Sequence, residues 1–176
     1  MVFAEISGLH EAGIMSCVKH FPGHGDTKGD THKGQVSIEK TWEELKKCEL
    51  VPFINSIDTT DMVMISHITT PNITGDNLPA SLSNDIIEGK LRKELGYKGV
   101  VISDAMEMGA ITKKYSSEES AVKAIVAGVD IILMPEDFVE SYNGIYDAVK
   151  DGVISETRID DSVLRILNLK ELYHLL

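Results

Sequence analysis

Four short apolar runs recur along the chain, and a segment with helical periodicity follows each of them. The runs cover residues 13–18, 62–66, 99–103 and 129–134 (GIMSCV, MVMIS, GVVIS and VDIILM). Each run is too short for a helix and is apolar without alternation, which is typical of strands that are covered on both faces. Strands that alternate with helices in this order are expected to be parallel and joined by right-handed crossovers. The sequence therefore predicts an α/β fold with four parallel βα units.

The segments between and after these runs carry the helical patterns. Thr41 and Glu44 have the spacing of a capping box at the start of a helix, and Gly96 and Gly128 stand where two helices are expected to end. No internal repeat, low-complexity segment or linker interrupts the order, so one domain is predicted over residues 1–176. The predicted helices cover residues 41–57, 83–95, 117–127 and 138–150, and a last helix starts near residue 160.

The charge of the chain limits its partners. A formal net charge of -11 repels the phosphates of nucleic acids and anionic lipid headgroups.

No apolar run approaches the ~20 residues that span a bilayer, and the first residues lack the pattern of a signal peptide. Cys17 and Cys48 have neither metal-binding spacing nor the density of a disulfide framework. We expect a cytoplasmic protein with reduced cysteines and no nucleic-acid or membrane partner, while secretion of a longer parent chain stays open.

Ionisable side chains follow three of the apolar runs. Lys19 and His20 come after the first run, His67 after the second and Asp104 after the third. The carboxyl ends of parallel strands form the ligand-binding face of an α/β sheet. We therefore expect these side chains to share one site.

The first run leads into KHFPGHGDTKGDTHKG, residues 19–34, whose glycines exclude a helix. A metal cluster is one interpretation, but Lys28 stands where a calcium loop needs an oxygen ligand, and the paired spacing of zinc ligands is missing. A phosphate cradle is another, but the glycines match no phosphate-binding motif. A solvated, turn-rich loop is a third. A catalytic loop is the fourth: in an extended segment Asp30 and His32 project to the same side, so the carboxylate can hold one imidazole nitrogen and leave the other for proton transfer.

This loop resembles the signature loop of the β-N-acetylhexosaminidase branch of glycoside hydrolase family 3. Thr31 stands where serine is commoner in that branch. The resemblance covers nearly the whole chain and implies strands five to eight of a (β/α)8 TIM-like barrel. Residues 1–176 are then a single partial barrel domain that lacks the N-terminal half of the barrel. Four further stretches carry the resemblance: VMISHITTP (63–71), VVISDAMEMGAI (100–111), AGVDIILMP (127–135) and RIDDSVLRILNLK (158–170).

The resemblance also implies a role for each residue of the site. Asp104 resembles the nucleophile that attacks the anomeric carbon and forms a glycosyl-enzyme. His32 resembles the acid/base, and Asp30 resembles the partner that orients its ring. No metal and no cofactor is implied. Three positions resemble residues that bind or surround the sugar: Lys19, His20 and His67.

The implied activity is that of a retaining exo-β-N-acetylglucosaminidase, which releases terminal N-acetylglucosamine from cell-wall fragments or chitooligosaccharides. The alternative is a non-catalytic half-barrel, which serves as a binding or assembly module or is a fragment that needs its N-terminal complement. Four βα units leave two sheet edges exposed, and an exposed edge invites pairing with another chain. The expected partners are therefore an N-acetylglucosamine-containing saccharide and either a second copy of the chain or the complementing half-barrel.

Overall fold

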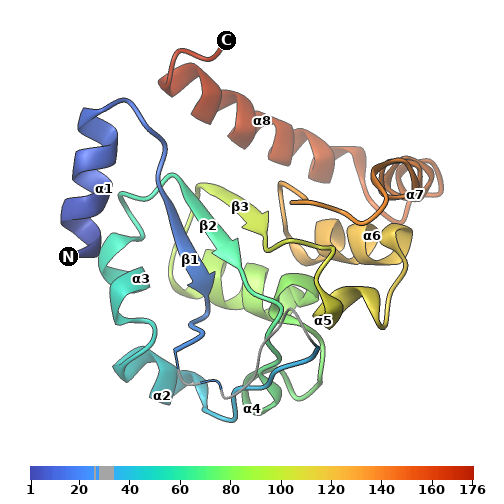
Figure 1. Cartoon of the computed structure of the whole chain (residues 1–176). Coiled ribbons are helices and arrows are strands. Elements are labelled where there is room, and N and C mark those ends of the chain that lie inside the picture. Colours follow the sequence, from blue (N-terminus) through green and yellow to red (C-terminus); the bar gives the residue numbers. More distant parts are fainter. Residues whose placement is uncertain (26, 28–33) are drawn as a thin grey trace.

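The computed structural model describes residues 1–25, 27 and 34–176, and its centre is a parallel sheet of three strands (Figure 1). The strands are β1 (Cys17–Phe21), β2 (Met62–Ile65) and β3 (Val100–Ser103), and they lie in that order. Val63 and Ile65 of β2 and most residues of β3 are buried, whereas Met62, Met64 and Ile102 are only partly buried. The sheet is therefore covered fully on one face and partly on the other. The second and third apolar runs therefore form strands as predicted, whereas the first strand starts only at Cys17 and extends past the predicted run to include Lys19 and His20.

The fourth apolar run lies beside β3 but does not form a strand of the sheet. One parallel bridge joins Ile102 to Ile131. The Ser103 N–H donates to the carbonyl of Ile131 at 3.0 Å, and the Ile131 N–H donates to the carbonyl of Val101 at 3.1 Å. The run leaves the extended conformation at Met134, whose φ of 45° lies in the left-handed region that strands do not adopt. The α/β fold with parallel strands is confirmed, whereas the described part of the chain forms three strands rather than the predicted four.

The helix predicted over residues 41–57 is two helices, α2 (Trp42–Lys47) and α3 (Val51–Ser56). Its start is as predicted, because Thr41 and Glu44 form the capping box. Pro52 explains the break, since a proline ring clashes with the carbonyl four residues earlier, at Cys48. Cys48 is the C-cap residue that directly follows α2.

Three of the later predicted helices form, two of them with the predicted bounds. α6 (Ser117–Ala127) and α7 (Phe138–Lys150) agree with the prediction, whereas α8 (Glu156–Leu172) begins before residue 160 because the side chain of Ser155 caps it. The segment after β2 forms a π-helix, η2 (Asp85–Glu94). Four elements were not predicted: α1 (Val2–Glu11), α4 (Pro71–Thr74), η1 (Ala80–Leu82) and α5 (Gly109–Thr112).

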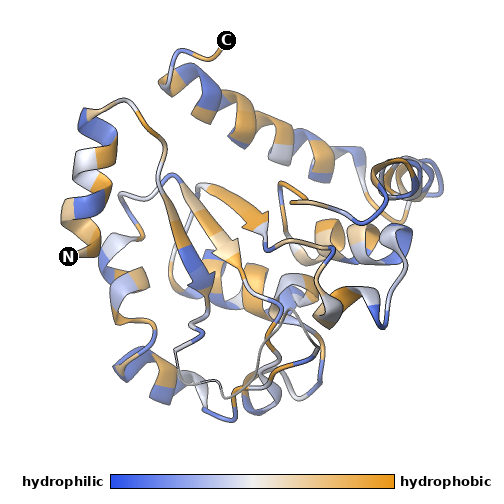
Figure 2. Cartoon of the chain, in the orientation of Figure 1, coloured by the Kyte–Doolittle hydropathy of each residue, from blue (hydrophilic) through white to orange (hydrophobic). Residues whose placement is uncertain are grey.

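The main hydrophobic core lies between the sheet and the helices that follow its strands. The ring of Phe21 makes edge contacts with the rings of Phe53, at 5.4 Å between centroids, and Trp42, at 6.3 Å. Figure 2 shows apolar residues along β3, a hydrophilic carboxyl end of β1, and helices that carry both apolar and polar residues. A smaller core joins α6 and α7 to the chain before α8 through Ile125, Ala148 and Ile154. No helix of the described residues is long and apolar enough to cross a membrane.

One carboxylate fastens α8 to the sheet. Asp130, at the start of the fourth run, has a side chain with no exposed surface. Its Oδ2 accepts hydrogen bonds from Arg92 at 2.7 Å and from the N–H of Val101 at 2.9 Å. Its Oδ1 accepts from Ser162 at 2.5 Å and from Arg165 at 3.0 Å, both in α8. The core, the sheet and the last helix therefore meet at one buried charge.

A second carboxylate joins the two terminal helices at the amino-terminal end of β2. Asp61 Oδ2 accepts hydrogen bonds from the Ser16 N–H at 2.6 Å, from His10 of α1 at 2.8 Å and from Tyr173, directly after α8, at 2.9 Å. Burial alone would raise the pKa of this carboxyl. The hydrogen bonds, with those of Ser16 foremost, outweigh burial and hold the pKa below its usual value.

The lowered pKa of Asp61 predicts a pH-dependent contribution to stability. Replacing Asp61 by Asn should lower the free energy of unfolding at pH 7 by about 2 kcal/mol, because hydrogen bonds to a charged acceptor are lost. The ionised carboxylate stabilises the fold above the unfolded-state pKa, and this contribution disappears as the pH falls through the lower folded-state pKa. Urea unfolding measures this at pH 7 and in a series below pH ~4. The free energies of unfolding of the parent and the variant should differ at pH 7 and become equal as the pH falls. The exposed neighbour Asp58→Asn is the control, and an equal gap at every pH would contradict the prediction.

Candidate active site

Asp104 lies one residue beyond β3, with a side chain that is 15% exposed. Its N–H donates to the carbonyl of Ile65 in β2 at 2.9 Å, which extends the strand pairing up to the carboxylate. The N–H of Ala105 donates to Asp104 Oδ1 at 2.9 Å. One carboxylate oxygen is thus held by the backbone, and the other is left to face its surroundings.

His20 of β1 faces that other oxygen. Its Nε2 lies 3.8 Å from Asp104 Oδ2, which is longer than a hydrogen bond. His20 belongs to β1 and Asp104 follows β3, the two outer strands of the sheet. Because the strands are parallel, their carboxyl ends lie on the same side of the sheet, as expected from the sequence. The peptide bonds Lys19–His20 and Phe21–Pro22 are cis.

His67 lies two residues beyond β2 and is fully buried. Its Nε2 lies 3.0 Å from the carbonyl of Ala105, so Nε2 carries the proton and donates it. Its Nδ1 then accepts a hydrogen bond from the hydroxyl of Ser81 at 2.7 Å. Burial lowers the pKa of the imidazole, although the Ala105 contact and the nearby Asp104 oppose this shift. His67 is therefore a neutral ring with both nitrogens bound to protein, directly behind the turn that carries Asp104.

A cavity of about 690 Å³ opens next to His20 and is lined mainly by polar side chains. Lys19, His24, Lys40 and Glu49 contribute to its wall. Lys40 Nζ lies 2.5 Å from Glu49 Oε1, whereas Glu49 Oε2 is buried without a hydrogen-bond partner among the described residues. The cavity therefore combines several cationic or imidazole donors with one carboxylate.

Gly23 fixes the start of the histidine-rich loop against this wall. Its φ is 120°, a conformation that L side chains rarely adopt, and a Cβ added to it would lie 2.6 Å from Glu49 Cβ. Beyond it, the hydroxyl of Thr27 lies 2.8 Å from His24 Nδ1. Only glycine allows the loop to pass this close to the turn between α2 and α3 that carries Glu49.

Asp30 and His32 lie outside the described residues, so their predicted roles as dyad partner and acid/base stay predictions. Within the described ranges, no three His, Cys, Asp or Glu side chains come together as a set of metal ligands. Residues of the site that the sequence did not single out include Ser81, Glu49 and Lys40. Ser81 is 14 residues from His67, and Glu49 lies in a segment of ordinary helical pattern, so neither gave a local signal.

Comparisons with known proteins show to which family this chain is similar. The family model described as the glycosyl hydrolase family 3 N terminal domain matches residues 1–169. Beta-hexosaminidase A of Pseudoalteromonas piscicida is 31% identical over 188 residues, which cover 95% of this chain and 31% of that protein. The beta-hexosaminidase of Idiomarina loihiensis is 37% identical over 132 residues, or 75% of this chain and 39% of that protein.

A solved structure agrees with these sequences. The glycoside hydrolase family 3 beta-N-acetylglucosaminidase from Paenibacillus sp. superposes with a TM-score of 0.94 and 44% identity. The superposition covers 97% of this chain and 33% of that chain. The chain therefore spans between about a third and two fifths of the length of these relatives.

Proposed function

The chain belongs to glycoside hydrolase family 3, and we propose that it carries the nucleophile and the acid/base of a retaining exo-β-N-acetylglucosaminidase. The observation that supports this most directly is Asp104 at the carboxyl end of β3, with Oδ1 held by the Ala105 N–H and Oδ2 facing His20. A carboxylate that is fixed at one oxygen and open at the other suits attack at an anomeric carbon. The beta-N-acetylglucosaminidase and beta-hexosaminidase relatives support the choice of sugar.

In the proposed mechanism Asp104 Oδ2 forms a bond to the anomeric carbon while the bond from that carbon to the aglycone oxygen breaks. His32, oriented by Asp30, gives its proton to the leaving oxygen. It then takes a proton from water, which attacks the same carbon and releases Asp104, so that the anomeric configuration is retained. Lys19 and His20 bind hydroxyl groups of the terminal N-acetylglucosamine. Cell-wall fragments or chitooligosaccharides are the proposed substrates.

His67 acts in this proposal as a positioning residue. Its Nε2–H holds the carbonyl of Ala105, and Ala105 in turn holds Asp104 Oδ1 through its N–H. The ring is fixed by Ser81 on its other side. A sugar hydroxyl would have to displace one of these partners to reach a ring nitrogen, so we assign His67 to the turn rather than to the sugar.

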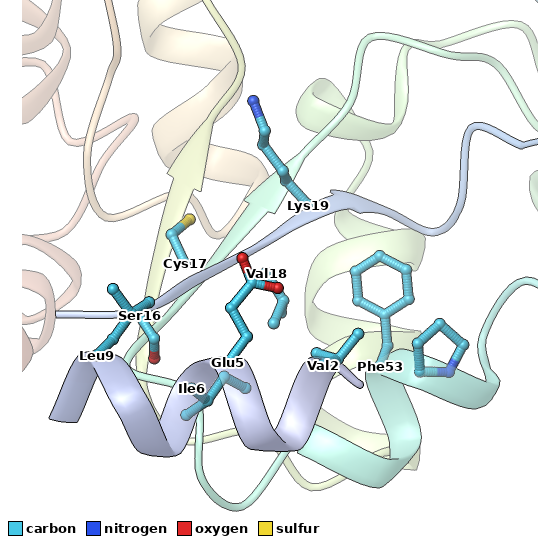
Figure 3. Close-up of a pocket in the computed structure, with 10 residues that line it drawn as sticks. Val2, Glu5, Ile6, Leu9, Ser16, Cys17, Val18, Lys19 and Phe53 are labelled. Atoms are coloured by element: carbon cyan, nitrogen blue, oxygen red, sulfur yellow. The ribbon is translucent and has the colours of Figure 1, made fainter. Parts of the chain in front are cut away.

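We also propose that residues 1–176 form the second half of a barrel. The open edge of β1 supports this part of the proposal. Among the described residues no strand pairs with the edge of β1 that faces away from β2. Beside this edge lies a cavity of about 340 Å³ between α1 and α3, lined by Val2, Ile6, Leu9, Val18 and Phe53 among others (Figure 3). We propose that the N-terminal half of the barrel pairs with β1 and covers these apolar side chains. The same open edge favours the second candidate, a non-catalytic half-barrel that pairs with another copy of the chain.

Trapping the glycosyl-enzyme tests the nucleophile. In the protein completed with the N-terminal half of a related barrel, a 5-fluoro derivative of N-acetylglucosamine should label Asp104, as read by mass mapping of peptides. Asp104→Asn should remove the label. Glu107→Gln, which changes an exposed carboxylate in the same turn, should leave it in place.

Two further variants test the positioning role in the same assay. His67→Leu should slow labelling by about a hundredfold, because a small displacement of the reacting atom has effects of this size. His67→Gln, whose amide N–H can still donate to Ala105, should recover part of the rate. A label on a carboxylate other than Asp104 would show that the proposed mechanism is wrong.

A further inference from the structure

A groove between α7 and α8 has an aromatic wall that the proposed mechanism does not use. Tyr142 and Tyr146 lie on successive turns of α7, with ring planes 10° apart and centroids separated by 6.4 Å. The two residues are 59% and 54% exposed, so their neighbouring rings form an aromatic surface that solvent reaches. Figure 1 shows α7 next to α6 and to the first turns of α8.

The groove is a defined hollow of about 340 Å³, at the lower end of the range for ligand pockets. Its floor consists of Ile145, Val149 and Ile159, which pack against the smaller core. Its other wall carries Glu156 and Asp160, which are four residues apart and so lie on one face of α8. Both carboxylates are exposed. The groove shares no lining residue with the cavity at His20.

These three surfaces match the chemistry of an acetamido sugar. A pyranose ring has an apolar C–H face that stacks on an aromatic ring, and hydroxyl and amide N–H groups at its edge that need acceptors. The carboxylates supply acceptors, and the aliphatic floor can receive the acetamido methyl group. A cationic peptide is the main competing occupant, but Lys150 Nζ already lies 5.4 Å from the centre of the Tyr146 ring and takes the cation position on that ring.

We propose that this groove is a second saccharide-binding site, which holds a β-linked N-acetylglucosamine oligosaccharide away from Asp104. The choice of sugar rests on the proposed function, because a polymeric substrate of the enzyme would be the saccharide present. A site of this size with two exposed rings should bind weakly, with a dissociation constant on the order of 1 mM. It would keep an oligosaccharide near the enzyme between successive cleavages.

The test uses fluorine NMR of the chain labelled with 3-fluorotyrosine, in an Asp104→Asn background so that the sugar is not cleaved. The five resonances, from Tyr97, Tyr115, Tyr142, Tyr146 and Tyr173, are assigned by single replacements with Phe. Titration with N,N′,N″,N‴-tetraacetylchitotetraose should shift the signals of Tyr142 and Tyr146 saturably. The other three signals should stay in place.

Two matched variants identify the contact. Tyr142→Ala should weaken binding about tenfold or more, whereas Tyr142→Phe, which keeps the ring, should change it by at most about threefold. Phe138→Ala removes a ring of α7 that is 72% exposed but does not line the groove, and should leave the affinity unchanged.

Three results would overturn the proposal. The first is the absence of a saturable shift of Tyr142 and Tyr146 at about 20 mM sugar. The second is a stronger response to a lysine-rich peptide, which would assign the groove to a cationic partner. The third is sedimentation as a dimer that Tyr142→Ala dissociates, which would assign it to a second copy of the chain. Failure of the Asp104 trapping experiment would leave the shifts unaffected, so the two proposals fail separately.

Discussion

The chain alone should hydrolyse a nitrophenyl N-acetylglucosaminide at most very slowly, and supplying the N-terminal half of a related barrel should raise the rate by about a thousandfold or more. The described residues place Asp104 and His20 at one rim but leave the other edge of β1 unpaired. A sugar held from one side only is poorly oriented for attack, and orientation accounts for a large share of catalysis. Fusion of that N-terminal half before Val2, followed by measurement of kcat/KM, gives the comparison.

Asp104→Asn in the fused protein is the control, since it should return the rate to that of the chain alone. The cavity between α1 and α3, beside β1, gives a second readout. In the fused protein, Cys17 should become protected from thiol reagents, because it lies in β1 and lines that cavity. The exposed Cys48 should remain reactive. A chain that sediments as a monomer and has full activity without its complement would contradict the prediction.

The largest expected loss of stability follows from removal of the Asp130 carboxylate. Asp130→Ala should lower the free energy of unfolding by about 3–5 kcal/mol, because the charges of Arg92 and Arg165 and the N–H of Val101 lose a buried partner. Arg92 is only 9% exposed, so water replaces the lost carboxylate poorly. Urea unfolding followed by circular dichroism measures the change.

A surface ion pair provides the matched comparison for Asp130. Asp147 lies 3.9 Å from Lys150, and the two side chains are 65% and 62% exposed. Asp147→Ala should therefore change the free energy of unfolding by less than about 0.5 kcal/mol. Similar losses in the two variants would show that the Asp130 cluster is not the anchor of α8.

The local signals in the sequence predicted most of the elements around the site. The bounds of α6 and α7 were predictable because the side chains of Ser116 and Asp137 cap their first turns and Gly128 ends α6. Helical periodicity runs through residues 41–57 and does not reveal the break between α2 and α3, which follows from Pro52. The fourth run was predicted as a strand, but pairing depends on neighbours that periodicity does not reveal, and only Ile131 forms a bridge.

In the candidate site, too, some features were predictable from the sequence and others were not. The positions of Asp104, His20 and His67 at the ends of their strands were predictable, because parallel strands end on one rim. The partners of His67 were not, because its contacts with Ser81 and Ala105 depend on how the chain folds after β2 and β3. A buried ring with two protein partners cannot be distinguished in sequence from one that faces a ligand.

The contacts of Asp61 have a consequence for how the molecule opens. His10 and Tyr173 lie at opposite ends of the chain, yet both donate to the same carboxylate oxygen. Helix ends usually fray independently and exchange their amide protons early. Here both ends are hydrogen-bonded to the carboxylate of Asp61. If one end unfolds, the carboxylate loses a donor, so the intact contact of one end raises the free energy needed to unfold the other. We therefore expect the last turn of α1 and the end of α8 to exchange their amide protons as one cooperative unit, although the two helices lie at opposite ends of the chain.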